Sequence, residues 1–212
     1  MTSRFVVATA LVGAVLGTSL PAQATPIVGV TISNDGTGDL GGFVNMGYSF
    51  VANVATSVVS LGVWDQDNDG LKNRHEVGLW ASDATLLASA FVGAGTAGIL
   101  DSGFRFTDIS PVLLTAGRTY YVAALFNGPG DDMWVANPTS VLTAPQITYD
   151  SRRFVPTMAL AFPALVGSSI FTNGYWGGNV RLDAQAVPAP EPTTMVLLGS
   201  GLAAAFFRHR RR

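Results

Sequence analysis

Cysteine is absent from the 212 residues of this chain, and histidine occurs only at His75 and His209. The first absence excludes thiol catalysis, disulfide bonds and cysteine-based zinc sites. Because only His75 lies outside the basic C-terminus, a His-rich zinc site is excluded as well. The fold must therefore depend on its hydrophobic core or on a metal bound by other ligands.

Sustained helical periodicity with capping residues is also missing between residues 25 and 187. In its place, short apolar-alternating runs are separated by Gly, Asn, Asp and Pro. Nine runs are predicted strands: 27–33, 47–52, 57–64, 76–81, 86–92, 103–109, 119–126, 146–149 and 180–184. Many short strands with frequent turns predict an all-β fold, a single β-sandwich of jelly-roll or Ig-like Greek-key type.

The N-terminal residues 1–24 have the three parts of a secretory signal peptide. Arg4 supplies a positive charge, residues 5–16 form an apolar run, and Ala22 and Ala24 provide a small-x-small cleavage site. The apolar run is too short for a permanent transmembrane helix. We therefore predict export and cleavage by signal peptidase after Ala24.

Residues 188–212 form a tail that is expected to lie outside the folded body. The motif Pro190, Glu191 and Pro192 precedes an apolar segment, 193–207, and a basic end, 208–212. As a helix the apolar segment is about 22 Å long, whereas the hydrocarbon core of a bilayer is about 30 Å thick. It therefore predicts a marginal transmembrane helix that contacts the inner membrane transiently, with its arginines on the cytoplasmic side. The alternative is an ordinary permanent anchor.

This tail resembles the PEP-CTERM sorting signal in its Pro-Glu-Pro motif, the apolar residues that follow and the terminal Arg-His-Arg-Arg-Arg. The resemblance implies that an exosortase, a membrane transpeptidase, recognises the tail and removes it near the motif. It also implies a Gram-negative bacterium that makes exopolysaccharide, and delivery to the cell surface or the extracellular matrix of a biofilm. The motif residues would then be substrate elements and not catalysts.

The predicted body, residues 25–187, is acidic once both ends are set aside. It contains 13 Asp and Glu against 7 Lys and Arg, a net charge of −6. Such a charge argues against binding to nucleic acid or to an anionic membrane surface, and it is compatible with divalent cations. At this length a single domain can bury close to 70% of its unfolded surface.

Residues 65–76 fit the calcium-loop spacing Asp-x-Asp-x-Asp-Gly-x5-Glu. The predicted oxygen ligands are the side chains of four acids and one backbone carbonyl: Asp65, Asp67, Asp69, Glu76 and Leu71. Because predicted strands flank the loop in place of the helices of an EF-hand, we expect a structural Ca²⁺ at a hairpin tip, with Asp131 and Asp132 as further candidates. The alternative is a solvated acidic turn, in which Asp and Gly serve turn geometry.

The spacing Leu114-x-x-Gly117-x-x-Tyr120 resembles a tyrosine corner at the start of a strand. In such a corner the tyrosine hydroxyl bonds back to upstream backbone. Ala116 stands where a Pro is usual. The implied role is structural, since the corner holds a Greek-key crossover in place.

The body also resembles DUF4082, a family of uncharacterised secreted β domains common on PEP-CTERM proteins. The matching elements are residues 61–63, 69–71, 75–80, 86–90, 103–106, 114–121 and 174–179. The resemblance implies a sandwich fold and brings no established activity with it.

Catalytic motifs are scarce in the body. There is no G-x-S-x-G motif for a nucleophile elbow. The position of His75, directly before Glu76 at a predicted strand start, favours a role in a turn or in packing. Paired carboxylates leave one alternative open, a small glycosidase or lyase of jelly-roll fold. We expect a protein that is not an enzyme.

Trp134 and Trp176 are the candidate glycan-binding residues, because each lies in a Gly- and Asn-rich predicted loop. An exposed indole can stack on a sugar ring. The alternative is that both rings close over the ends of the core. Trp64 and Trp80, which flank the acidic loop, are expected in the core or in cross-strand pairs.

Together these features predict an exported surface or matrix protein with a structural or adhesive role. Its expected partners are signal peptidase, the exosortase and an exopolysaccharide, and nucleic acid is not among them. The expected cofactor is at most a structural Ca²⁺.

Overall fold

The computed structural model describes residues 25–39 and 42–184. The regular secondary structure of these residues consists of β-strands, with no helix among them. Each of the nine predicted runs contains a strand. Six short strands have no counterpart among the predicted runs: β3 (Thr37–Asp39), β8 (Ile99–Asp101), β11 (Trp134–Ala136), β12 (Val141–Thr143), β14 (Leu165–Val166) and β15 (Tyr175–Trp176). The described part of the chain holds no helix that is long and apolar enough to cross a membrane.

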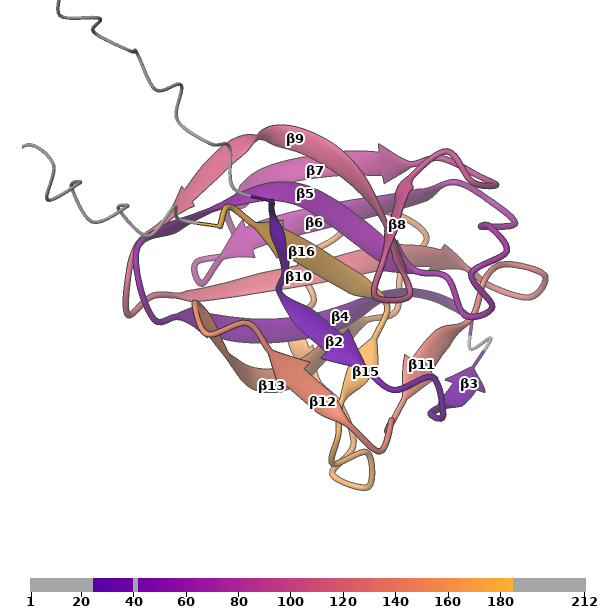
Figure 1. The fold of residues 1–212 in the computed structure, drawn as a ribbon. Helices are drawn as coiled ribbons and strands as arrows, with labels where there is room; N and C mark the ends of the chain where they lie inside the picture. Colours follow the sequence, from indigo (N-terminus) through magenta and orange to yellow (C-terminus); the bar gives the residue numbers. More distant parts are fainter. Residues whose placement is uncertain (1–24, 40–41, 185–212) are drawn as a thin grey trace, which may run out of the picture.

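Two antiparallel sheets form the layers of a sandwich (Figure 1). The first has the order β1 (Ile27–Val28), β16 (Gly178–Leu182), β5 (Thr56–Trp64), β9 (Phe104–Leu114) and β8. The second has the order β14, β13 (Ile147–Val155), β4 (Phe43–Ala52), β10 (Thr119–Asn127), β6 (His75–Ala81) and β7 (Leu86–Val92). Two smaller sheets, β15–β11–β3 and β12 with β2 (Val30–Ile32), complete the fold. The prediction of an all-β sandwich is confirmed.

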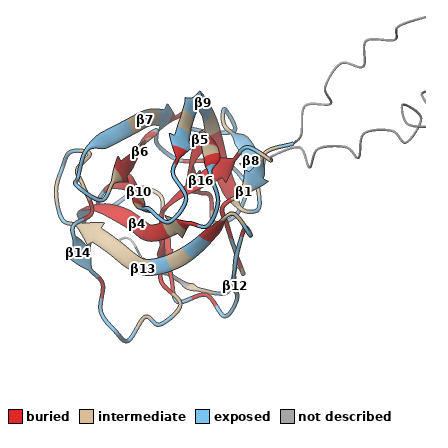
Figure 2. Ribbon diagram, turned by 90° about the vertical axis from the view of Figure 1, so that its left-hand side faces the viewer, coloured by how far each residue is buried: buried red, intermediate tan, exposed pale blue. Residues whose placement is uncertain are grey.

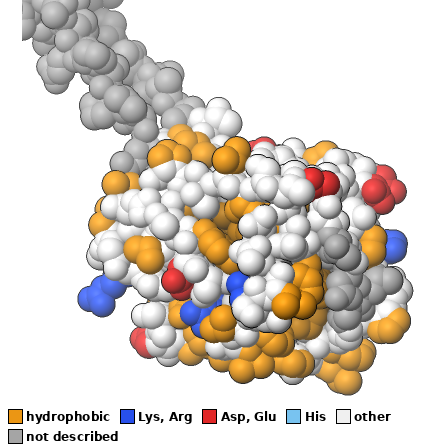
Figure 3. Space-filling view, turned by 90° about the horizontal axis from the view of Figure 1, so that it is seen from below, with side chains coloured by type: hydrophobic (Ala, Val, Ile, Leu, Met, Phe, Trp, Pro, Cys, Tyr) orange, Lys and Arg blue, Asp and Glu red, His pale blue; other side chains and the backbone are white. Residues whose placement is uncertain are grey.

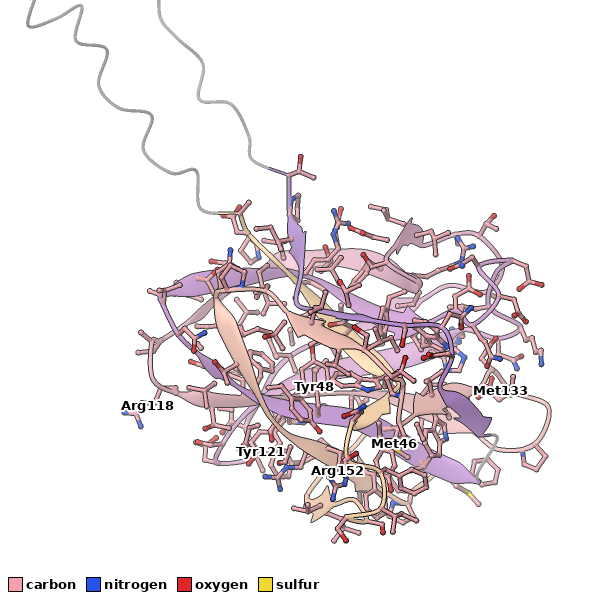
Figure 4. All side chains as sticks on the ribbon, turned by 60° about the horizontal axis from the view of Figure 1, so that its bottom comes forward. Met46, Tyr48, Arg118, Tyr121, Met133 and Arg152 are labelled. Atoms are coloured by element: carbon pink, nitrogen blue, oxygen red, sulfur yellow. The ribbon has the colours of Figure 1, made fainter. Side chains whose placement is uncertain are left out.

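The core lies between the two main sheets, where the buried residues concentrate (Figure 2). The chain crosses from one main sheet to the other at β4–β5, β5–β6, β7–β8 and β9–β10, and both layers contribute inward side chains. One buried polar contact joins the layers: the hydroxyl of Tyr48 on β4 donates to Oδ1 of Asn179 on β16 at 2.8 Å. Tyr48 points into the sandwich in Figure 4.

The connection between β9 and β10 and the acidic loop between β5 and β6 lie at opposite ends of the sandwich. Figure 4 marks the first end by Arg118 and the second by Met133. At the Arg118 end, the backbone N–H of Thr115 donates to the Tyr120 hydroxyl at 2.8 Å, and Gly117 has a φ of 77°. A residue with a Cβ would be strained at that φ. The predicted tyrosine corner is confirmed.

The described ends of the chain lie close together, because β1 pairs with β16 and Ile27 lies opposite Leu182. Both leave the sandwich at the upper left of Figure 1. The predicted cleavage site at Ala22 and Ala24, the Pro190–Glu191–Pro192 motif and the apolar segment 193–207 lie outside the described residues.

Candidate functional site

The acidic loop begins with a buried ion pair. Oδ2 of Asp65, directly after β5, lies 2.6 Å from Nε of Arg105 on β9, and both side chains are almost fully buried. The same oxygen accepts the backbone N–H of Gly70 at 3.2 Å, and Nη2 of Arg105 donates to the carbonyl of Asn68 at 3.1 Å. These contacts hold the loop against the first sheet.

Gly70 is required by the backbone of this loop. Its φ of 115° is one that side chains with a Cβ rarely adopt, and a Cβ built there would lie 2.8 Å from the carbonyl carbon of Gly95. Asn68, two residues earlier, has a φ of 58°. The turn geometry therefore requires the glycine at position 70, whether or not a metal binds.

Three of the five predicted calcium ligands line one small pocket of about 110 Å³. Its walls are formed by Asp65, Gln66, Asp67, Asp69, Gly70, Lys72, Asp132 and Met133. Asp67 and Asp69 are exposed, and Oε1 of Gln66 is buried without a donor among the described residues. Asp132 comes to this pocket from the loop after β10, as the sequence suggested.

The other two predicted ligands are elsewhere. The carbonyl of Leu71 accepts the N–H of Gly95 at 2.6 Å in an isolated β-bridge, and Leu71 is 3% exposed. Glu76 lies on β6 opposite Phe91 and does not line the pocket. In a calcium loop the twelfth-position Glu binds the ion with both carboxylate oxygens. Here β6 begins at His75, and strand pairing carries Glu76 away.

A cluster of His75, Asp131 and Asp132 lies beside this pocket, and no sequence pattern predicts it as a unit. Nε2 of His75 is 2.8 Å from Oδ2 of Asp132 and 3.4 Å from Oδ1 of Asp131. Nδ1 of the same ring is 2.8 Å from the carbonyl oxygen of Leu125. No short-range spacing could have revealed this cluster, because 57 residues separate His75 from Asp132.

Burial and hydrogen bonding compete in setting the protonation of this cluster. Burial lowers the pKa of His75, but the contacts with Asp132, the Leu125 carbonyl and Asp131 outweigh it and raise that pKa above its ordinary value. Burial raises the pKa of Asp132, but hydrogen bonds from His75 and from the N–H groups of Lys72 and Asn73 bring it below its ordinary value. The contact between His75 and Asp132 therefore favours a cationic ring beside an ionised Asp132.

The two tryptophans predicted to bind glycan belong to the core cluster. Trp134 is 6% exposed and Trp176 is 0% exposed. The Trp176 ring packs between Tyr48 and Tyr149, with centroid distances of 5.1 and 5.3 Å, and its Nε1–H donates to the carbonyl of Asn173 at 2.7 Å. Neither indole offers the open face that stacking on a sugar needs, so both rings follow the alternative of closing the core.

Each of these tryptophans nevertheless lines a pocket, and the two pockets differ in character. Trp134 and Tyr175 line an apolar pocket of about 320 Å³ with Phe43, Phe154 and Phe171. Trp176 lines a second pocket, of about 300 Å³, and most of the other residues around it are of types that carry a hydroxyl or an amide group. Tyr175 and Trp176 are adjacent on β15, and side chains alternate along a strand, so they reach different pockets. Hydrophobic side chains also gather on the face seen from below (Figure 3).

Trp64 and Trp80 are 2% and 3% exposed, which confirms their predicted burial. Trp64 packs edge-on against Phe104 of the neighbouring strand β9, with ring centroids 5.0 Å apart. The packing of Trp64 against Phe104 therefore helps to fix the end of β5, where the acidic loop begins.

Comparison with known families finds a match for the folded body and another for the C-terminal residues. Residues 188–212 match the PEP-CTERM protein-sorting motif, whose processing partner is an exosortase. A β-sandwich followed by this signal defines a secreted or cell-surface protein that an exosortase processes. Residues 32–163 match the family described as a domain of unknown function, DUF4082, and the chain belongs to that family. No curated protein and no solved structure matches the chain.

Proposed function

We propose that this protein is a structural or adhesive component of an exopolysaccharide or biofilm matrix, released from transient inner-membrane anchoring by an exosortase. The observation that carries the proposal is the sorting motif at residues 188–212 behind a β-sandwich domain. The acidic body supports a role away from nucleic acid and anionic membranes.

The hydroxyl-lined pocket supports binding of a glycan. Its walls are Val141, Thr143, Thr148, Tyr149, Thr172, Asn173 and Trp176. Sugar hydroxyls both donate and accept hydrogen bonds, and threonine and asparagine side chains offer both. A volume of about 300 Å³ is at the lower end of small-molecule sites, and it suits one sugar unit of a chain. In this proposal the buried Trp176 forms part of the pocket wall, and the hydroxyl groups of the threonines recognise the ligand.

The acidic pocket supports a structural Ca²⁺ at Asp65, Asp67 and Asp69. Calcium takes oxygen ligands and tolerates water among them. The amide oxygen of Gln66, which has no donor among the described residues, adds a neutral oxygen on the same wall. Leu71 and Glu76 have no part in this proposal.

The glycan proposal is tested by electrophoresis of the purified protein through gels that contain the host exopolysaccharide. Retardation of the wild type and its loss in Thr143→Val and Thr148→Val are expected, because these changes keep the shape of two exposed pocket residues and remove their hydroxyl groups. The matched control is Leu113→Ala, a change of a 72% exposed side chain on β9, away from this pocket. Equal mobility with and without polysaccharide would end the glycan proposal. Release of oligosaccharide in the same mixture would favour the glycosidase or lyase alternative over a binding role.

A further inference from the structure

Three side chains from distant parts of the sequence meet at the acidic-loop end of the sandwich. His75 begins β6, and Asp131 and Asp132 follow β10. One ligand atom from each lies within 4.8 Å of the other two. We propose that His75, Asp131 and Asp132 bind a divalent transition metal of the zinc type. This site combines Asp131 and Asp132 with His75 and uses none of the proposed calcium ligands Asp65, Asp67 and Asp69, and it goes beyond the proposed matrix role.

The hydrogen bonds of the imidazole require a cation at Nε2. The carbonyl oxygen of Leu125, 2.8 Å from Nδ1, can only accept, so Nδ1 carries a proton. Nε2 then faces oxygens of Asp131 and Asp132, which also only accept when they are ionised. A neutral ring would direct its Nε2 lone pair at these oxygens. Either a proton or a metal ion has to occupy the space between them.

The surrounding hydrogen bonds orient the ligands as they do around metals. A ligating histidine usually donates its other N–H to a carbonyl or carboxylate, as Nδ1 does to Leu125. Oδ1 of Asp131 accepts from Nδ2 of Asn73 at 2.9 Å, and Oδ2 accepts the N–H of Asn127. Asp132 accepts the N–H groups of Lys72 and Asn73 at 3.0 and 3.2 Å. Each carboxylate is fixed by the backbone and keeps lone pairs for a metal.

The geometry fits zinc better than calcium. Tetrahedral zinc with bonds of about 2.0–2.1 Å places its ligands roughly 3.3–3.5 Å apart. The 3.4 Å between His75 and Asp131 already matches, and the 2.8 Å between His75 and Asp132 must lengthen by about half an ångström. Two carboxylates balance the charge of the ion. Asp132 is 11% exposed and lines the acidic pocket, which leaves an approach for the ion and for a water as fourth ligand.

The test uses the full chain with His209→Gln, so that His75 is the sole histidine. After treatment with a chelator, Co²⁺ is added as a spectroscopic probe, and Zn²⁺ as its competitor. Visible ligand-field bands that zinc displaces are expected, with affinity at least tenfold weaker in Asp131→Asn and Asp132→Asn. Asp83→Asn is the matched control, since Asp83 lies in the turn between β6 and β7, outside both the cluster and the acidic pocket, and its Co²⁺ bands should be unchanged.

A second measurement does not depend on the variants folding. In the ¹⁵N spectrum of the His75 ring, addition of Zn²⁺ should move Nε2 from its protonated to its metal-bound shift and leave Nδ1 protonated. If Nε2 keeps its proton through a titration to millimolar zinc, the cluster is only an imidazolium–carboxylate contact and the proposal is overturned. Co²⁺ bands of full strength in a folded Asp131→Asn or Asp132→Asn protein would overturn it as well.

Discussion

Nε of Arg105 lies 2.6 Å from Oδ2 of Asp65, and this contact joins β9 to the first residue of the acidic loop inside the protein. Because both side chains are almost fully buried, neither charge has water to replace its partner. The two residues therefore belong to the framework that shapes the acidic pocket, whatever that pocket binds.

Removing one partner of this pair should destabilise the fold strongly. Arg105→Met leaves the Asp65 carboxylate buried and unpaired, and we expect a loss of about 3 kcal/mol in the free energy of unfolding, measured in urea. The double variant Asp65→Asn/Arg105→Met should lose less than Arg105→Met alone, because no buried charge remains. Arg118→Met, at an exposed position, should stay within about 0.5 kcal/mol of the wild type. Equal losses for the single and double variants would contradict a buried ion pair.

Tyr120→Phe should cost about 1 kcal/mol of stability, because it leaves the N–H of Thr115 without the hydroxyl that accepts it. Tyr121→Phe is a matched control on the same strand, where the ring packs on Phe162 with centroids 4.7 Å apart. Removal of its hydroxyl should change little. Denaturant unfolding of both variants compares them directly, and identical midpoints would show that the corner bond contributes nothing.

Free calcium should raise the melting temperature if the acidic pocket binds it. An ion that binds only the native state stabilises by about 2.7 kcal/mol at a hundred times its dissociation constant. Asp67→Asn and Asp69→Asn should abolish the shift, whereas Asp83→Asn, in the turn between β6 and β7, should leave it intact. The same melting curve in EDTA and in millimolar calcium would dismiss the calcium proposal.

The hydrogen bonds of Asp35 should make the stability of the fold depend on pH in the acidic range. Hydrogen bonds from the hydroxyls of Ser33 and Thr139 and from the Thr139 backbone N–H lower its pKa from 3.8 to about 2. Since the folded pKa is the lower one, this contribution is fully present above the unfolded pKa and is lost as the pH falls towards 2. Asp35→Asn should therefore melt below the wild type at pH 7, with the difference closing between pH 4 and 2. A constant difference across that range would contradict this assignment.

Local patterns predicted the framework well, and contacts between distant residues escaped them. The tyrosine corner depends on residues five apart, Thr115 and Tyr120, so its spacing is visible in the sequence. The longer strands were predictable as well, because the alternation of apolar and polar residues along a strand is also a short-range pattern. Strands of two or three residues, such as β15 and β11, carry too few positions for a pattern, and they form because their neighbours pair with them.

The candidate site shows the same division. The Asp-x-Asp-x-Asp-Gly spacing predicted that Asp65, Asp67 and Asp69 gather, and they line one pocket. Glu76 departs because pairing of β6 with β7 decides its direction, and that pairing is not part of the loop motif. Gly and Asn neighbours suggested an exposed Trp176, but tertiary packing against Tyr48 and Tyr149 covers it.

The pairing of β16 with β1 on one side and β5 on the other has a mechanical consequence. The chain leaves the sandwich after β16, so a pull on the C-terminal side acts along the axis of this strand. Backbone hydrogen bonds in an antiparallel sheet are perpendicular to the strands. Such a pull therefore loads the bonds to both neighbours at once, in shear, and does not open them one after another. A tether at this end should resist extraction far better than one on an edge strand such as β7.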